Sequence, residues 1–406
     1  MNRRHFLGLG GAAAAAARPA LPFQDEKSKL KITGVRLVSP RPRVPRERYT
    51  PPPGSHSLSE SEIANPMSIY PEYKAKRSLF QASGPGTGGF WVEITTDRGV
   101  KGLGSGGPAG GPIVENHLTR FLIGQDPFNI ERLWDIMWRS TMYYGRMGVT
   151  MNAISGVDNA LWDLIGNALG LPVYKLLGGA VRDRTLCYVT GNNLETYLKM
   201  GFTKLKLATP YGPADGRAGM KKNFELAKQT RDLIGGDGDV MLDCWMAFTE
   251  AYTIELAQML EPLRIYWMEE CLQPHDYAGY GRLRAQIKST LIVTGEHEYG
   301  RYGFRQLLEH NSAAIWQPDM HWCGGLTELR RIAALAAAYD IPVLPHSGGA
   351  RDSIHFGTAT VNSPMCEIVT PLPTQQFAEE YQFTKGPEGV YTRPSDKPGF
   401  GWDVVV

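Results

Sequence analysis

Residues 202–245 read FTKLKLATPYGPADGRAGMKKNFELAKQTRDLIGGDGDVMLDCW. A short β-type run at 204–208 opens this stretch, and a second one at 240–243 closes it. Between the two runs, the apolar residues of 224–233 follow the spacing of a helix. The stretch therefore predicts a strand–helix–strand unit whose two strands are parallel.

The same alternation continues on both sides of this unit. Further β-type runs lie at residues 186–190, 266–269, 292–295, 314–317, 343–346 and 366–368, and helical stretches, among them 249–260, 304–309 and 327–338, lie between them. Eight strands that alternate with helices predict a parallel (β/α) barrel over about 166–374. An open doubly wound sheet is the alternative, but the G-x-G-x-x-G turn typical of that fold does not follow residues 186–190.

The first part of the chain has a different pattern. Two short strands are expected at 90–96 and 100–103, and helical spacing follows from 114 to 165. We therefore predict an α+β domain over residues 29–165, completed by about 375–406. Its proline-rich segments, 40–45 and 51–54, indicate loops, and such a loop beside a site often acts as a lid.

Composition excludes several classes of protein. The 43 basic and 41 acidic residues nearly balance, so nucleic acid is not an expected partner. Five cysteines without a C-x-x-C pair argue against a disulfide framework or a zinc cluster, and we interpret Cys244, Cys271, Cys323 and Cys366 as packing residues. No run reaches the roughly 20 apolar residues of a membrane span.

The N-terminal segment has the features of a targeting sequence. Paired arginines, Arg3 and Arg4, precede Phe6-Leu7 and a Gly/Ala run, which resembles a twin-arginine export signal. We assign residues 1–28 to a signal peptide and linker and expect a bacterial periplasmic or secreted protein. An alanine-rich N-terminal helix is the alternative, but Gly8, Gly10 and Gly11 would weaken it.

Polar residues recur at the predicted strand ends, once in each β/α unit. They are Lys204 and Lys206, Asp243, Glu269 with Glu270, Glu296, Asp319, His346 and Glu367. Because strand ends converge at the C-terminal mouth of a barrel, we expect these groups to share a rim. Three crowded carboxylates, Asp243, Glu269 and Glu296, would repel one another unless a cation joined them. Oxygen ligands that leave positions for water or substrate favour Mg²⁺.

Candidate bases flank this predicted metal site. The i, i+2 spacing of Lys204 and Lys206 points both ammonium groups the same way, and a lysine near another cation can act as a base. Asp319 could accept a ring N–H of His346 and raise its basicity, which makes a candidate dyad. Glu367, in its protonated form, could donate a hydrogen bond to a substrate oxygen.

Taken together, the motifs resemble a known family. Ala160-Leu-Trp-Asp-Leu164, the glycine pair Gly178-Gly179, Lys204-x-Lys206, Trp267-Met-Glu-Glu270, Gly295-Glu296, Gln317-Pro-Asp319 and Pro345-His346 are similar to the enolase superfamily, mandelate racemase/muconate lactonizing enzyme subgroup. Trp322-Cys-Gly-Gly-Leu-Thr327 further resembles the rhamnonate dehydratases of that subgroup. The resemblance implies a modified TIM barrel, (β/α)7β, under an N-terminal α+β capping domain.

The resemblance also implies an activity. Mg²⁺ held by Asp243, Glu269 and Glu296 would assist removal of the proton α to a carboxylate, with Asp319–His346 as base, and loss of water would give a 2-keto-3-deoxy sugar acid. Arg77 and, in the cap loop, His56 would bind the substrate. A homo-oligomer is also expected. A racemase or epimerase that uses Lys206 and His346 on opposite faces, and a non-catalytic sugar-acid binding protein, are the alternatives.

Overall fold

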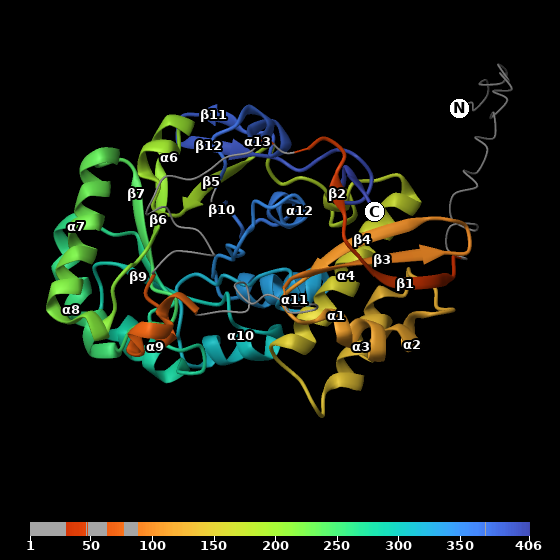
Figure 1. Cartoon of the computed structure of the whole chain (residues 1–406), viewed down its shortest axis with the longest axis horizontal. Helices are drawn as coiled ribbons and strands as arrows, with labels where there is room; N and C mark the ends of the chain where they lie inside the picture. Colours follow the sequence, from red (N-terminus) through yellow and green to blue (C-terminus); the bar gives the residue numbers. More distant parts are fainter. Residues whose placement is uncertain (1–29, 46, 48–62, 77–87, 370) are drawn as a thin grey trace, which may run out of the picture.

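The computed structural model describes residues 30–45, 47, 63–76, 88–369 and 371–406. A sheet of largely parallel strands, ringed by helices, lies beside a smaller antiparallel sheet with its own helices (Figure 1). The predicted fold class, a (β/α) barrel with an α+β cap, is confirmed. None of the described helices combines the length and the apolar character needed to cross a membrane.

The cap is built on a three-stranded sheet. Its strands are β1 (Ile32–Val38), β3 (Phe90–Thr96) and β4 (Lys101–Gly106), in the order β1-β3-β4 and antiparallel throughout. The strand predicted at 90–96 has these same bounds. Around it lie α1 (Gly111–Ile113), the π-helical turn η5 (Val114–Leu118), α2 (Thr119–Leu122), α3 (Ile130–Thr141) and α4 (Val149–Leu169). Two further turns, η2 (Pro66–Ile69) and η3 (Pro71–Lys76), lie against the barrel instead, where Lys74 donates to the Pro210 carbonyl (2.8 Å).

Helix α4 joins the cap to the barrel. It is buried along nearly its whole length and packs on β4 on one side and on α11 (Gly325–Ala337) on the other. A Cβ atom on Gly102 or Gly104 of β4 would stand 2.2 Å from the backbone of α4 at Ala160. Glycine is therefore required at both positions, because only a strand without side chains there can approach the helix so closely.

The barrel strands follow one another around a sheet. β5 (Thr185–Thr190), β6 (Lys204–Ala208), β7 (Asp239–Asp243), β8 (Trp267–Glu269) and β9 (Leu291–Val293) pair in parallel in this order, and β10 (Met365–Val369) pairs back onto β5. Single bridges from Thr294 to Trp316 and from Trp316 to Val343 continue the path between β9 and β10. The first and last strands therefore meet, as in a barrel.

The prediction of regular strands at 314–317 and 343–346 was wrong. The structure has isolated bridges there, at Trp316, Val343 and between Asp319 and His346. The reason is proline: Pro342 precedes one segment and Pro345 lies within it, and Pro318 directly follows the other. Since proline has no N–H to donate, neither segment can sustain a continuous ladder.

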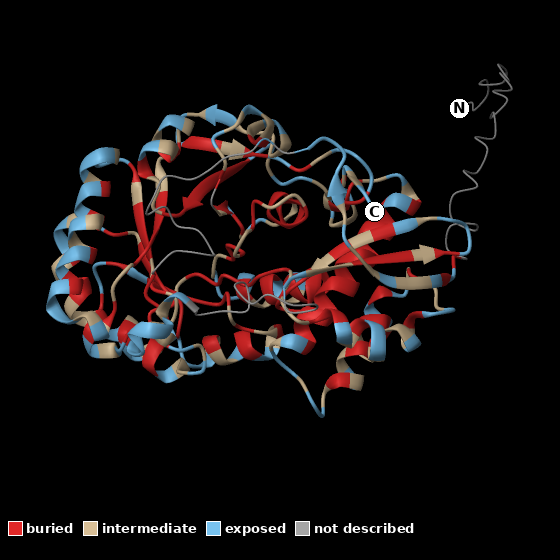
Figure 2. Cartoon of the chain, in the orientation of Figure 1, coloured by how far each residue is buried: buried red, intermediate tan, exposed pale blue. Residues whose placement is uncertain are grey.

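Helices cover the outside of the barrel and bury one face against the strands (Figure 2). They are α5 (Val173–Leu176), α6 (Leu194–Met200), η6 (Pro213–Asp215), α7 (Gly216–Ile234), α8 (Glu250–Leu260), η7 (Glu261–Leu263), α9 (Tyr277–Gln286), α10 (Gly300–Glu309), α11, α12 (Ser353–Ala359) and α13 (Gln375–Glu380). The five cysteines are buried and free, with Cys187 facing Cys366 across β5 and β10.

The C-terminal segment touches both parts of the molecule. The hairpin of β11 (Thr384–Gly386) and β12 (Gly389–Thr392) extends the barrel sheet at β5. Beyond it, the Phe400 N–H donates to Asp163 of α4 (2.7 Å), and Trp402 packs edge-to-face on Trp91. Finally, β13 (Val404–Val405) pairs with β2 (Arg41–Pro42).

Candidate active site

Three carboxylates meet at the C-terminal mouth of the barrel. Asp243 is the last residue of β7, Glu269 the last of β8, and Glu296 follows β9. One oxygen from each lies within 4.8 Å of the others. Parallel pairing places Asp243 opposite Glu269, and this register brings the first two together.

The charge of this cluster fits a divalent cation. Burial raises the pKa of Glu296 to about 7 and also raises the pKa values of Asp243 and Glu269. Carboxylates that are ionised in such surroundings need a compensating positive charge. Three oxygen donors from separate strand ends suit Mg²⁺, which keeps further positions for water or substrate oxygens.

Lys206 is the cation already inside this cluster. Its Nζ contacts Glu269 (2.5 Å), Glu367 (2.8 Å) and Asp243 (3.4 Å), and its side chain is 1% exposed. Burial acts to lower the pKa of Lys206, but the three carboxylates outweigh it and raise the pKa well above its usual value. The ammonium group is therefore tied up by acidic partners.

Lys204 does not reach the cluster, contrary to the prediction. It is the first residue of β6, and its Nζ forms an ion pair with Asp239 at the start of β7. Two residues of strand separate it from Lys206, a rise of about 6.6 Å toward the other end of the barrel. The i, i+2 spacing places both lysines on one face of β6, but at different positions along the strand, so only Lys206 reaches the carboxylates.

Glu367 joins the cluster, but in the opposite state to the predicted one. Its oxygens accept from Lys206, from the Thr190 hydroxyl and from the Ser347 N–H (2.8 Å). Burial would raise its pKa, but the positive charges of Lys206 and His346 lower it to about 2. Glu367 is thus ionised, and donors already occupy its oxygens, so the expectation of a protonated donor was wrong.

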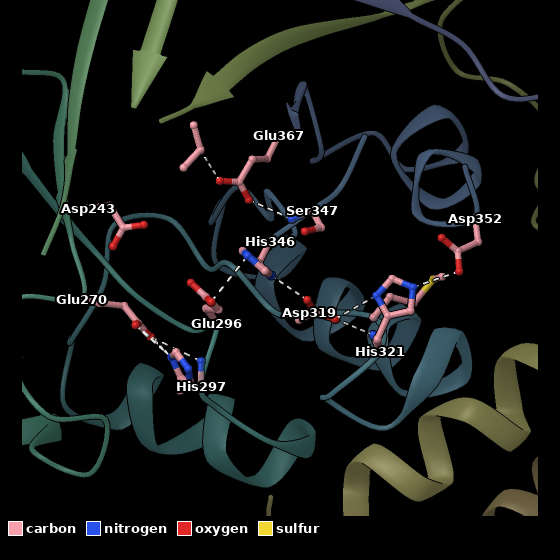
Figure 3. A network of polar contacts seen from close by, with 12 residues as sticks. Asp243, Glu270, Glu296, His297, Asp319, His321, His346, Ser347, Asp352 and Glu367 are labelled. Atoms are coloured by element: carbon pink, nitrogen blue, oxygen red, sulfur yellow. Dashed lines mark hydrogen bonds and ion pairs between the residues drawn. The ribbon is translucent and has the colours of Figure 1, made fainter. Parts of the chain in front are cut away.

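Asp319 and His346 come together as a pair at the same mouth (Figure 3). Nδ1 of His346 lies 2.6 Å from Oδ2 of Asp319, and its Nε2 lies 3.4 Å from Oε1 of Glu296. Burial acts to lower the pKa of His346, but Glu296, Glu367 and Asp319 together raise it to about 10. Since Asp319 engages Nδ1, Nε2 is the ring nitrogen that faces the carboxylate cluster.

The roles of two histidines beside the site, His297 and His321, were not predicted from the sequence. Nδ1 of His297 contacts both oxygens of Glu270 (3.0 and 2.9 Å). His321 stands between Asp319 (3.1 Å) and Asp352 (2.9 Å). The sequence signal for both histidines was weak. His297 directly follows Glu296 and His321 comes two residues after Asp319, so closeness to a predicted site residue was the only indication.

Several of these groups, among them Asp243, Glu296 and His346, line a cavity of about 300 Å³ between cap and barrel. Its polar walls come from both domains, and its lining also includes apolar groups. The lining residues are Ile63, Gly89, Ser105, Gly106, Gly107, Pro108, Thr190, Asp243, Trp245, Glu296, Asp319, His321, Trp322, His346, Ser347, Glu367 and Val369. The predicted substrate-binding residues His56 and Arg77, like the predicted signal peptide 1–28, lie outside the described residues.

Comparison with known families identifies the architecture. Residues 190–405 match the family described as enolase C-terminal domain-like, and residues 90–178 match the mandelate racemase/muconate lactonizing enzyme N-terminal domain. The chain belongs to the enolase superfamily. The resemblance expected from the sequence motifs is thereby confirmed.

Individual members of the enolase superfamily are also similar. The L-rhamnonate dehydratase of Saccharopolyspora erythraea is 42% identical over 84% of this chain and 89% of its own length. Among solved structures, an L-rhamnonate dehydratase from Gibberella zeae has a TM-score of 0.79 at 37% identity and covers 93% of each chain. A second structure from Gibberella zeae, a rhamnonate dehydratase complexed with Mg, has a TM-score of 0.77 at 35% identity, over 93% of this chain and 94% of that one.

Proposed function

We propose that this enolase-superfamily member is a Mg²⁺-dependent sugar-acid dehydratase, and that an L-rhamnonate-like aldonate is its substrate. The main support for the proposal is the position of the Asp319–His346 pair. Nε2 of His346 lies 3.4 Å from Glu296, one of the three clustered carboxylates, and both residues line the same cavity. The 42% identity to an L-rhamnonate dehydratase supports the choice of substrate.

Asp243, Glu269 and Glu296 would hold the cation. When bound, Mg²⁺ supplies positive charge that stabilises the negative charge developing on the substrate carboxylate as its α proton leaves. Glu269 is fixed for this role, because Trp267 (3.1 Å), Gln317 (2.5 Å) and Lys206 all donate to it. A cation on Glu296 would also offset the charge that raises the pKa of His346, so that more of its imidazole would be in the neutral form that can accept a proton at neutral pH.

His346 would move the proton in both directions. Its Nε2 takes the α proton, while Asp319 at Nδ1 stabilises the imidazolium that results. The same Nε2 then returns the proton to the departing β-hydroxyl, which leaves as water. The enol that remains tautomerises to the 2-keto-3-deoxy acid, so the overall change is the loss of one water.

Lys206 argues against the racemase alternative. A two-base mechanism requires a neutral amine on the face opposite His346. Here three carboxylates surround the Lys206 ammonium group, and Lys206 is not among the residues that line the cavity, whereas His346 is. We therefore assign Lys206 to balancing the charge of Glu367 and Glu269 instead of to proton abstraction.

The proposal is tested with a panel of aldonic and aldaric acids. The purified protein and MgCl₂ are incubated with each acid, L-rhamnonate and its epimers included, and 2-keto acid is measured as its semicarbazone. We expect product from one stereochemical set, lost with EDTA and restored by excess Mg²⁺. If no acid gives a keto acid but the α hydrogen exchanges with solvent deuterium, the racemase alternative replaces this proposal; no product and no exchange would support a binding protein.

We further propose that residues 1–28 direct export by the twin-arginine route and that the enzyme assembles as a homo-oligomer. The paired Arg3 and Arg4 support the first proposal. Replacing both with lysine should keep the protein in the cytoplasm when its location is followed by fractionation. Light scattering of the purified protein tests the second: a monomeric mass would contradict it.

A further inference from the structure

His321 forms a bridge between two buried carboxylates beside the base pair. Its Nδ1 lies 3.1 Å from Oδ1 of Asp319, and its Nε2 lies 2.9 Å from Oδ2 of Asp352 (Figure 3). Both aspartate side chains are 3% exposed. Both ring nitrogens of His321 therefore have an acidic partner, although the imidazole lines the cavity.

The bridge requires a doubly protonated ring. Only an imidazolium has a donor at both nitrogens. Burial acts to lower the pKa of His321, but Asp352 and Asp319 outweigh it and raise the pKa well above its usual value. A fixed positive charge with two directed donors thus sits next to the carboxylate that orients His346.

The bridge is anchored at both ends. Asp352 is the N-cap of α12, where its Oδ1 accepts from the Ser353 N–H (3.0 Å), and its Oδ2 also lies 3.5 Å from the Ser105 hydroxyl of the cap strand β4. The backbone of His321 is held as well, because its N–H donates to Asp319 (2.5 Å) and its carbonyl accepts from Gly107 (2.9 Å). The imidazole therefore has little freedom to turn.

The consequence falls on Asp319. Its Oδ1 accepts from His321, and its Oδ2 faces Nδ1 of His346 at 2.6 Å. A carboxylate held at one oxygen cannot rotate away from the ring held at the other. We propose that His321, anchored by Asp352, is a positioning residue that fixes Asp319 and, through it, the ring of His346 for proton transfer. The inference rests on the proposed function, in which His346 is the base.

Two substitutions of His321 separate positioning from structure. His321→Phe keeps a ring in place and removes both side-chain donors, while the backbone N–H of residue 321 still reaches Asp319. His321→Asn keeps a donor at the position of Nδ1, because the Asn amide nitrogen is attached to Cγ as Nδ1 is, and it loses the positive charge and the link to Asp352. Loss of an outer partner of a catalytic site typically costs about 10–100-fold in activity. A matched control is His355→Asn, which alters a buried histidine whose Nδ1 accepts from the Tyr174 N–H outside the cavity.

In the dehydration assay with L-rhamnonate, His321→Phe should lower kcat by about 10–100-fold. Its KM should change by less than about threefold, because the interaction serves the transition state more than substrate binding. His321→Asn should recover a clear part of the lost kcat, and His355→Asn should keep the wild-type value. If His321→Phe kept kcat within about twofold, or if His355→Asn lost as much, the inference would be overturned while the proposed function stood.

A second readout does not depend on turnover. With ¹⁵N-labelled histidine, NMR reports the protonation and hydrogen bonding of each imidazole, and a His346→Asn sample assigns the His346 signals among the nine histidines. We expect the Nδ1 signal of His346 to move in His321→Phe and to stay in His355→Asn. An unchanged His346 signal in His321→Phe would contradict the positioning role even if L-rhamnonate proved not to be a substrate.

Discussion

The charged ammonium group of Lys206 is buried and is stabilised by ion pairs. Its ammonium group is 1% exposed and is shared by Glu269, Glu367 and Asp243. Replacing it by an apolar residue would leave those buried carboxylates without their counter-charge, which costs about 3–5 kcal/mol in comparable pairs. The charge of this residue therefore serves the folded site as well as its chemistry.

The two lysines of β6 give a direct prediction. Lys206→Met should lower kcat by at least about 100-fold, since it removes a fixed charge from the catalytic mouth, and it should lower the midpoint of urea unfolding. Lys204→Met removes only the ion pair with Asp239 and should keep kcat within about twofold, because a part-exposed pair contributes little. Steady-state kinetics and urea titration measure both. An equal loss of kcat in the two variants would contradict the placement of Lys204 outside the site.

At the scale of elements, the contact between β4 and α4 determines how the cap is seated. Gly104→Ala would set a Cβ 2.2 Å from the α4 backbone, so the strand or the helix must shift. Overpacking of this kind costs about 1–3 kcal/mol. Gly88→Ala is the matched control, because a Cβ there meets no atom within 4 Å. Urea unfolding should show the loss for Gly104→Ala only; equal midpoints for the two variants would refute the close approach.

Helix α4 also carries a buried acid whose charge depends on pH. Burial raises the pKa of Asp158 to about 7. The folded protein therefore holds a proton that the unfolded chain loses near pH 4, and the stability this contributes disappears as the pH rises toward 7. Asp158→Asn removes this titration while keeping an acceptor for the Thr327 N–H.

The expected effect is a difference in slope. Between about pH 4 and 7 the unfolding free energy of the wild type should fall relative to that of Asp158→Asn by about 1.4 kcal/mol per pH unit, the value for one proton. Urea titrations at four pH values measure this difference, in which the other titrating groups cancel. Parallel curves would show that Asp158 titrates normally in the folded chain.

At the scale of the whole molecule, the alternation of apolar strand runs with helical stretches was enough to predict the barrel and the cap. Spacing was also enough to predict that Asp243, Glu269 and Glu296 would converge, since consecutive parallel strands end at one rim. Regular strands near Trp316 and Val343 were predicted wrongly, because apolar runs do not show where proline interrupts a ladder.

Some features of the site could not be predicted from the sequence, because they depend on position along a strand and on contacts with residues distant in the chain. Lys204 and Lys206 share a face of β6, but depth along the strand decides which one meets the carboxylates. The state of Glu367 depends on donors from three other segments, and the role of His321 depends on Asp352, 31 residues away. No local pattern contains these contacts.

In the proposed mechanism, His346 is the base beside a carboxylate-bound Mg²⁺. The most direct test compares wild type and His346→Asn in parallel, with 2-keto acid formation from L-rhamnonate and Mg²⁺ binding by calorimetry. We expect the variant to lose turnover by at least about 10³-fold, as when a catalytic base is removed, and to bind Mg²⁺ nearly as the wild type does. Full turnover in His346→Asn would contradict the assignment of the base, and loss of Mg²⁺ binding together with turnover would show that His346 serves the metal site instead.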